Sequence, residues 1–236
     1  MALKRKPPKN NVRRVHSTGT NIRGVTLGTD STTQQFESFE ERKLALLLQR
    51  DKTILKFVSQ PMLLNYVDQE CKQRTYTPDY LVERLDGSIE IHEVTITLRQ
   101  HREDIIRRTD AARRICRARG WKYVQHTEQT LPCGTTLANL QALYLYAPRC
   151  YSDRVVADAT FELLSTAGGR PVSLRLLAIR LMQTLKLPAD RIVPVLAHLI
   201  WHSKIETDLR RLLFINATPS PQALIWLPQL PTETTG

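Results

Sequence analysis

YTPDYLVERLDGSIEIHEVT, residues 76–95, carries the clearest architectural signal in the chain. Two runs rich in β-branched and aromatic residues flank the dipeptide Asp86-Gly87, a pattern that predicts two strands joined by a tight turn. If the two strands pair, Asp79 in the first strand approaches Glu93 in the second. The segment therefore predicts a hairpin that carries two neighbouring carboxylates.

The two acids of this hairpin suit a metal ion. Side chains alternate between faces along a strand, so Glu93 and Thr95 point to the same side. Two carboxylates with backbone carbonyls form a hard oxygen site for Mg²⁺ or Mn²⁺, ions that polarise a phosphate and activate water. The alternative is a hairpin whose two acids form ordinary surface ion pairs, and the spacing by itself favours this alternative.

The segments around the hairpin predict an α/β domain over residues 31–150. Hydrophobic periodicity and turn signals set the expected order of its elements. That order is a helix from Glu37, a strand pair interrupted at Gln60-Pro61, the hairpin, a long helix over residues 98–119, a strand over residues 121–127 and a short helix over residues 135–147.

Two further regions flank this domain. Residues 1–30 are polar and basic and predict a flexible arm, which either follows a phosphate backbone or is a solvated tail. Residues 151–236 predict a mostly α domain of three amphipathic helices, with short strands over residues 205–227. Three helices with a small flap of strands are typical of a winged helix.

The charge of the chain favours a polyanionic partner, with nucleic acid as the first candidate. Lys and Arg total 34 against 23 Asp and Glu, a formal charge of +11. The helix over residues 98–119 contains eight arginines and no lysine, and the arginine fork suits bidentate phosphate contact. The DNA-binding candidates are Arg13, Arg14, Arg99, Arg102 and Arg107.

Other functional classes find little support in the sequence. No apolar run reaches the roughly 18 residues that span a membrane, and the N-terminal segment lacks the apolar centre of a signal peptide. The four cysteines form no CxxC pair. They therefore predict reduced thiols in the cytoplasm rather than a disulfide framework or a zinc site.

The ordered motifs resemble the N-terminal domain of TnsA, the endonuclease subunit of heteromeric bacterial transposases. The resemblance rests on SFEERKLALLLQRDKTILKFVSQPMLLNY, YTPDYLV and DGSIEIHEV. GWKYVQHTEQTL and NLQALYLY also look like the strand and short helix that follow in this family. The resemblance implies a restriction-endonuclease-like PD-(D/E)xK fold, a mixed sheet flanked by helices, followed by the mostly α, winged-helix-like domain.

Transferred residue by residue, the resemblance implies three catalytic, metal-binding residues: Glu41, Asp79 and Glu93. Glu41 matches the glutamate of S-x-x-E counted from Ser38, and the alternatives in this glutamate-rich segment are Glu40 and Glu37. The bound cation is expected to be Mg²⁺ or Mn²⁺. Gln60 matches the QP of the family and either shapes the pocket or binds backbone at a strand end.

Thr95, the fourth catalytic position, departs from the family, which has a lysine there. That lysine is expected to orient or deprotonate the attacking water or to stabilise the developing charge. A neutral hydroxyl cannot replace a cation, so three interpretations stay open. Lys43 on the first helix or Lys122 on the following strand supplies the charge; the enzyme works slowly with two metal ions; or the domain no longer cuts.

The resemblance also implies a biological role and partners. The protein is expected to cut the non-transferred strand at the 5′ ends of a transposon, in the bacterial cytoplasm and away from any membrane. A TnsB-like integrase-fold transposase would cut the other strand for cut-and-paste transposition, and the C-terminal domain would contact a TnsC-like AAA+ ATPase regulator. The alternatives are a catalytically inactive DNA- and protein-binding scaffold subunit and a freestanding restriction or repair nuclease.

Overall fold

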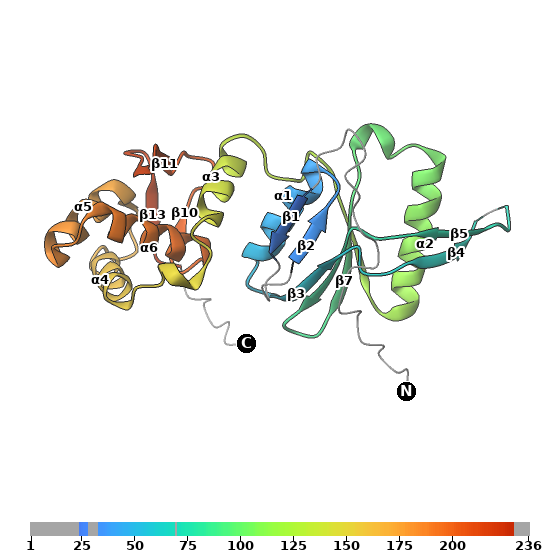
Figure 1. Ribbon diagram of the computed structural model, residues 1–236, viewed down its shortest axis with the longest axis horizontal. Coiled ribbons are helices and arrows are strands. Elements are labelled where there is room, and N and C mark those ends of the chain that lie inside the picture. The colour runs from blue at the N-terminus through green and yellow to red at the C-terminus, as the bar shows by residue number, and fades with distance from the viewer. Residues whose placement is uncertain (1–23, 28–32, 69, 229–236) are drawn as a thin grey trace. The chain divides into compact units, whose positions relative to one another are not determined.

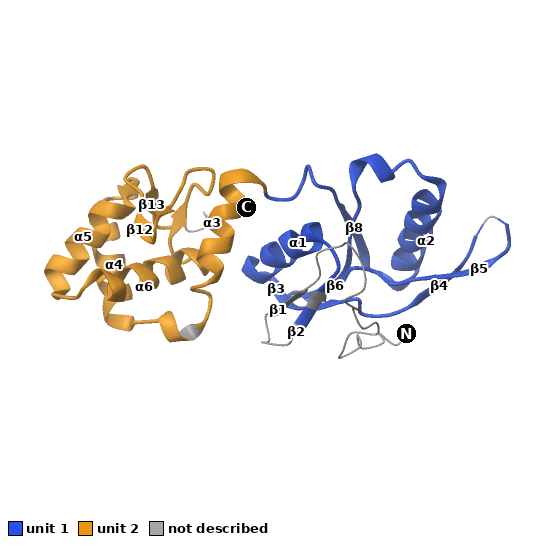
Figure 2. Cartoon of the chain, turned by 45° about the horizontal axis from the view of Figure 1, so that its top comes forward, with its two compact units in different colours: residues 1–132 blue, residues 133–236 orange. Residues whose placement is uncertain are grey.

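The computed structural model describes three stretches of the chain: residues 24–27, 33–68 and 70–228. Most of the predicted basic arm, including Arg13 and Arg14, lies outside these stretches. The chain divides into two compact units, residues 1–132 and 133–236 (Figure 2).

The second unit begins at Cys133, earlier than residue 151, where the sequence placed the boundary. The reason is helix α3 (Gly134–Tyr144), which packs against α6 (Ala189–Trp201). The side-chain amide of Asn139 on α3 donates to two backbone oxygens of the C-terminal segment, at 2.9 and 2.7 Å. These contacts between residues far apart in the sequence leave no trace in local periodicity.

A four-stranded sheet forms the centre of the first unit, in the order β3-β6-β7-β8 (Figure 1). Its strands are β3 (Ile54–Ser59), β6 (Tyr80–Arg84), β7 (Ile89–Val94) and β8 (Lys122–His126). Strand β6 pairs antiparallel with β3 and β7, whereas β7 and β8 are parallel. A parallel pair needs a crossover, which α2 (Glu103–Arg119) provides. This mixed sheet with flanking helices is consistent with a restriction-endonuclease-like fold.

The predicted hairpin is present as β6 and β7, and Gly87 in the turn has a φ of +80°, which favours glycine. The first arm of the hairpin is interrupted, because Pro78 has no N–H to donate to a sheet. The residues before the proline form β5 (Gln73–Tyr76), which pairs with β4 (Leu64–Val67) instead. Asp79 thus lies in a break between two strands.

Helices α1 (Phe39–Arg50) and α2 cover opposite faces of the sheet (Figures 1 and 2). The core on the α1 face includes Leu44, Leu48, Phe57, Tyr80 and Val82, with Val94 packed against it. The core on the α2 face includes Leu81, Ile91 and Cys116. Because side chains alternate along β7, Ile91 and Glu93 point to the α2 face, and His92 and Val94 point to the α1 face.

Smaller elements complete the first unit: the hairpin of β1 (Gly24–Leu27) and β2 (Thr33–Phe36), and a 3₁₀ turn, η1 (Thr97–Arg99). The side-chain oxygen of Gln34 on β2 accepts a 2.7 Å hydrogen bond from the backbone N–H of Ser59. This bond attaches the β1–β2 hairpin to the end of β3.

The described part of the second unit is mostly helical, as the sequence predicts. Its helices, besides α3 and α6, are η2 (Arg149–Tyr151), α4 (Arg154–Ser165) and α5 (Leu174–Leu185). Its strands are β9 (Val172–Ser173), β10 (Glu206–Thr207), β11 (Phe214–Ile215), β12 (Thr218–Pro219) and β13 (Leu224–Trp226). Strands β10, β13 and β9 form a small antiparallel sheet. The winged-helix-like assignment of this unit stays a prediction.

Within the described residues, no helix is both long enough and apolar enough to span a membrane.

Candidate active site

Asp79 is held in place by backbone contacts on both sides. Its backbone oxygen accepts a 2.8 Å hydrogen bond from the N–H of Gln60, and its Oδ2 accepts one of 2.7 Å from the N–H of Val94. The second bond places the carboxylate at the end of β7, beside Glu93. The structure therefore brings two of the predicted acids together.

Glu93 lies almost completely buried on the α2 face of the sheet, with 2% of its surface exposed. Its Oε1 is 2.7 Å from Nη2 of Arg108 on α2. Its Oε2 is buried and takes no hydrogen bond from any part of the chain that the structure describes. Burial raises the pKa of Glu93 to about 7, although the Arg108 charge opposes this shift.

The electrostatics of this pair favour a bound cation. Burial raises the pKa of Asp79 well above its ordinary value, and the charges of Glu93 and Glu41 raise it further. Adjacent carboxylates in a poorly solvated site cannot both ionise easily unless a positive charge lies nearby. Two oxygens are available to such a charge within the described structure: Oδ1 of Asp79, which takes no hydrogen bond, and Oε2 of Glu93.

Asp79 and Glu93 fit Mg²⁺ or Mn²⁺ as a partial ligand set. Within residues 24–27, 33–68 and 70–228, no group of three or more His, Cys, Asp or Glu side chains is already gathered as a metal site. Mg²⁺ is commonly held by one or two carboxylates, with waters and substrate phosphate oxygens as the other ligands. The donor set therefore suits a cation whose other ligands are waters in the free protein and include phosphate oxygens when DNA is bound.

Glu41 has a structural role at the start of α1. Ser38 is the N-cap, and its Oγ accepts a 3.1 Å hydrogen bond from the N–H of Glu41. The Glu41 carboxylate in turn accepts from Oγ of Ser38 at 2.9 Å and from the N–H of Glu37 at 2.8 Å. The S-x-x-E motif thus forms a variant of the capping box. Glu41 remains close enough to raise the pKa of Asp79 and of Glu93.

Thr95 lies buried beyond the end of β7, and its Oγ1 takes no hydrogen bond from the described residues. The two lysines predicted as replacements for the family lysine bind other groups. Nζ of Lys43 is 3.4 Å from Glu40 and lies over the ring of Phe39. Nζ of Lys122 is 3.2 Å from Glu90, whose side chain points to the α1 face, opposite Glu93.

Arg108 is the functional candidate that the sequence analysis did not single out. It is one of the eight arginines of the long helix, and composition does not distinguish it from the others. Its helical position does, because Arg108 precedes the buried Ala112 by four residues and so shares the core-facing stripe of α2. An arginine on that stripe is a signal for a buried acidic partner.

Glu90 is the second nearly buried glutamate of β7, at 3% exposure. Its carboxylate lies 2.9 Å from Nη2 of Arg84, 2.8 Å from Nε2 of His92 and 3.2 Å from Nζ of Lys122. Burial disfavours the Glu90 anion, but the hydrogen bonds from Arg84, His92 and Lys122 outweigh it and lower the pKa to about 2. Nδ1 of His92 also lies 2.9 Å from Nε2 of His126.

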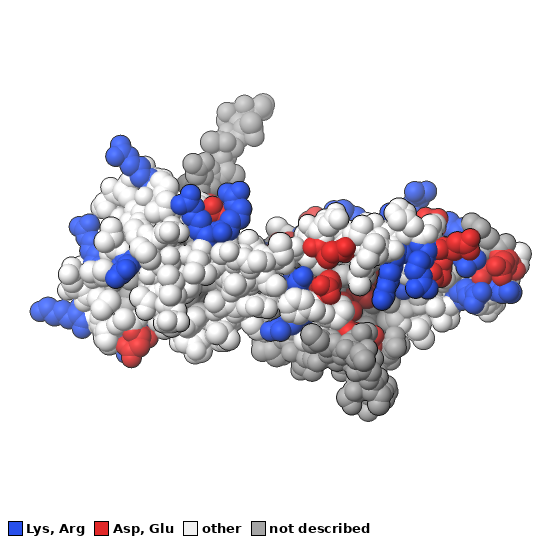
Figure 3. All heavy atoms as spheres, turned by 90° about the horizontal axis from the view of Figure 1, so that it is seen from above, with Lys and Arg blue, Asp and Glu red and all other residues white. Residues whose placement is uncertain are grey.

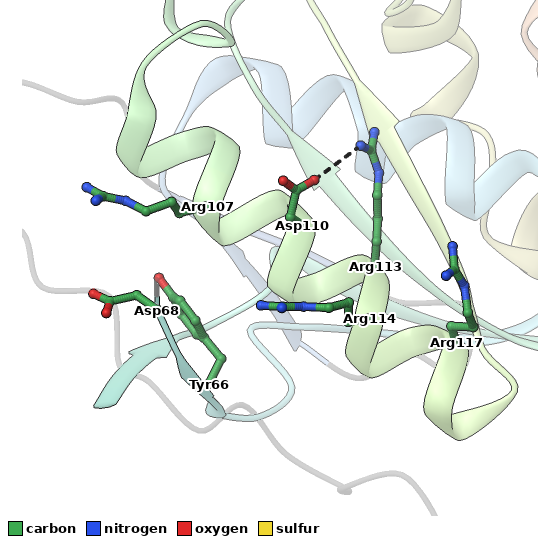
Figure 4. Close-up of a pocket in the computed structure, with 7 residues that line it drawn as sticks. All are labelled: Tyr66, Asp68, Arg107, Asp110, Arg113, Arg114 and Arg117. Carbon is green, nitrogen blue, oxygen red and sulfur yellow. Dashed lines mark ion pairs between the residues drawn. The ribbon is translucent and has the colours of Figure 1, made fainter. Parts of the chain in front are cut away.

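A basic pocket of about 340 Å³ lies between α2 and β4. Its lining residues are Tyr66, Asp68, Arg107, Asp110, Arg113, Arg114 and Arg117. Figure 4 shows Arg107 and Arg114 extending from α2 on the side of Tyr66 and Asp68. Within the described structure, Arg114 and Arg117 form no ion pair with an acid. This pocket can accommodate anionic groups such as phosphates.

The predicted DNA-binding arginines differ in their surroundings. Arg107, in the pocket, is 3.5 Å from Glu70. Arg102 forms an exposed pair with Asp104 at 3.1 Å, and Arg99 is exposed at the end of η1. Figure 3 shows basic and acidic side chains interspersed on one face of the first unit rather than a uniformly basic surface.

Comparison with known protein families gives a match within the first unit. Residues 51–128 match a family model described as the N-terminal domain of TnsA-like endonucleases. The matched segment contains the four-stranded sheet, α2, Asp79, Glu93 and Arg108, and it begins after Glu41. No curated protein matches the chain.

Proposed function

We propose that this chain is a TnsA-like endonuclease subunit that cleaves transposon-end DNA, because residues 51–128 match the family model of the TnsA-like endonuclease N-terminal domain. It cuts the non-transferred strand at the 5′ ends of the element for cut-and-paste transposition. The observation that carries this proposal is the contact of Asp79 with the end of β7, beside the buried Glu93, within the matched domain. Both carboxyl groups have raised pKa values, which is typical of functional sites.

The proposed reaction is hydrolysis of a phosphodiester. The oxygen of a water molecule bonds to phosphorus while one phosphorus–oxygen bond to a sugar breaks. The leaving sugar oxygen takes up a proton, and the attacking water gives one up to the solvent. When bound, Mg²⁺ or Mn²⁺ supplies Lewis acidity, which assists both the attack of water and the departure of the sugar oxygen. Asp79 and Glu93 would hold the cation through Oδ1 and Oε2, the oxygens left without hydrogen bonds in the described structure.

The pocket between α2 and β4 supports a path for the DNA backbone. Arg107, Arg113, Arg114 and Arg117 line it, and guanidinium groups bind phosphate oxygens without reading the base sequence. Arg108 points from the same helix toward Glu93. Helix α2 thus presents one set of arginines to the backbone of DNA and one arginine to the site of chemistry.

The partners follow from the same family relationship and are also proposals. A TnsB-like integrase-fold transposase cuts the other strand, and a TnsC-like AAA+ ATPase contacts the second unit. Leu176 and Ile179, one turn apart on α5, are exposed apolar side chains that support a protein contact. We expect Leu176→Asp to weaken capture of the regulator by the purified protein. Equal capture by Leu176→Asp and wild type would exclude this part of α5.

The test of the proposal is strand-resolved cleavage of labelled transposon-end DNA with Mg²⁺ or Mn²⁺ and the partner transposase present. We expect breaks in the non-transferred strand at the 5′ ends that depend on the cation and are lost in Asp79→Asn. Asparagine keeps an oxygen for the Val94 N–H and removes only the charge. Identical breaks from wild type and Asp79→Asn would refute the proposal.

A catalytically inactive scaffold is the second candidate function. It is favoured by the neutral Thr95 at the position of the family lysine and by Arg108, which already partly neutralises Glu93. A scaffold would support transposition products equally well with wild type or Asp79→Asn, and it would cut neither strand itself.

A further inference from the structure

Arg108 contacts the acidic pair directly, through Glu93. Its Nη2 lies 2.7 Å from Oε1 of Glu93. Its charge acts on both acids of the pair, because it lowers the pKa of Glu93 and of Asp79 against the effect of burial. In the described structure, Lys43 and Lys122 form their ion pairs with Glu40 and Glu90 instead.

The surroundings of Arg108 orient its guanidinium and leave part of it accessible. The group lies over the ring of Tyr76, 5.7 Å from the ring centroid, a contact that favours a cation. The Arg108 side chain is 31% exposed, whereas the Glu93 side chain is 3% exposed. A guanidinium has five N–H donors in a planar fork. One edge therefore binds Glu93, and the other donors remain available to a ligand that arrives from solvent.

The contact with Arg108 also gives the two carboxylate oxygens of Glu93 different surroundings. Oε1 binds the guanidinium, whereas Oε2 is buried and takes no hydrogen bond from the described residues. One carboxylate can therefore hold Arg108 through one oxygen and a divalent cation through the other. Thr95, whose Oγ1 takes no hydrogen bond from the described residues, supplies no charge next to this pair.

We propose that Arg108 is a catalytic residue that replaces the missing lysine, binding the scissile phosphate through its free N–H groups while Oε1 of Glu93 orients it. The inference rests on the proposed endonuclease function. The guanidinium cannot act as a general base, because it stays protonated in proteins. It stabilises the negative charge that develops on the phosphate oxygens as water attacks.

The first measurement compares cleavage rates of Arg108→Gln, Arg108→Lys and wild type under single-turnover conditions with saturating Mn²⁺. We expect Arg108→Gln to cut about 10²- to 10³-fold more slowly, the loss seen when one charge-stabilising donor is removed. Arg108→Lys keeps the charge but not the fork, so its rate should lie between the two. Arg154→Gln is the control, because Arg154 on α4 is highly exposed and its ion pair within the described residues is with nearby Asp158.

The second measurement is the affinity of each folded variant for Mn²⁺ without DNA, by calorimetry at pH 8. We expect Arg108→Gln to bind Mn²⁺ at least as tightly as wild type, because a repelling positive charge has been removed. Slow cleavage together with undiminished Mn²⁺ affinity is the signature of a group that acts on the phosphate. Thermal unfolding of every variant verifies that the fold is intact.

Three results would overturn the inference. Cleavage by Arg108→Gln at the wild-type rate would exclude a catalytic role for Arg108 and leave the endonuclease proposal standing. Slow cleavage with weakened Mn²⁺ affinity would make Arg108 only a positioning residue for Glu93. Absence of cleavage by the wild-type protein itself would refute the endonuclease proposal and the role of Arg108 with it.

Discussion

Glu90 and Glu93 occupy the same strand, are both almost completely buried and behave in opposite ways. Glu90, on the α1 face, has Arg84, His92 and Lys122 around it and a pKa of about 2. Glu93, on the α2 face, has Arg108 on one oxygen, no partner on the other within the described structure, and a pKa of about 7. Burial alone therefore does not identify a functional acid. A functional acid is identified instead by a buried carboxylate oxygen that lacks a hydrogen-bond or ion-pair partner.

Removing a charge from the acidic pair of Asp79 and Glu93 on the α2 face should reduce the cleavage activity of the protein but not its stability. For Asp79→Asn we expect cleavage to fall by about 10³-fold or more, because a ligand of the cation is removed. Thermal unfolding at pH 8 should occur at the same or a higher temperature, because repulsion with Glu93 is relieved. A clear drop in the unfolding temperature would show that Asp79 is a structural acid like Glu90.

The α1-face glutamate should show the reverse pattern. Glu90→Gln removes the anion that Arg84, His92 and Lys122 share, so we expect a loss of about 2 kcal/mol in the free energy of unfolding. Urea denaturation at pH 7 measures this loss. The cleavage rate per folded molecule should match wild type, and a rate as low as that of Asp79→Asn would remove the distinction between the two faces.

The acid range of pH isolates the contribution of Glu90. Its folded-state pKa of about 2 lies below the ordinary value of 4.5, so the folded state binds the proton less readily than the unfolded state. The stabilising contribution is therefore complete above about pH 4.5 and is lost as pH falls toward 2. The difference in unfolding free energy between wild type and Glu90→Gln should shrink over this window. A constant difference from pH 5 to pH 2 would contradict the assignment.

The smallest expected effect concerns the pocket between α2 and β4. Arg114→Gln with Arg117→Gln should weaken binding of end DNA and random DNA alike and lower the salt slope by about 1 for each phosphate that the protein no longer binds. Binding isotherms at several salt concentrations measure the slope. A change confined to the end sequence would point to base contacts instead, and an unchanged slope would place the DNA elsewhere.

The sequence predicted the hairpin well, because its signals are local. The alternation of side chains and the Asp86-Gly87 turn determine which residues face each other, so the proximity of Asp79 and Glu93 followed from residues 76–95. The catalytic role of these acids stays a prediction.

Two features depended on contacts that no local pattern records. The attachment of α3 to the second unit rests on hydrogen bonds from Asn139 to residues far along the chain. The proximity of Arg108 to Glu93 depends on how α2 packs on the sheet. The S-x-x-E motif was ambiguous for another reason, since a capping box and a catalytic glutamate need the same spacing from Ser38.

The most direct measurement is the single-turnover rate of end-DNA cleavage against Mn²⁺ concentration for wild type, Glu93→Gln and Glu90→Gln. We predict a saturable, cation-dependent rate for wild type and Glu90→Gln and no measurable rate for Glu93→Gln. Cation-dependent cleavage by Glu93→Gln at the wild-type rate would contradict the assignment of chemistry to the α2 face.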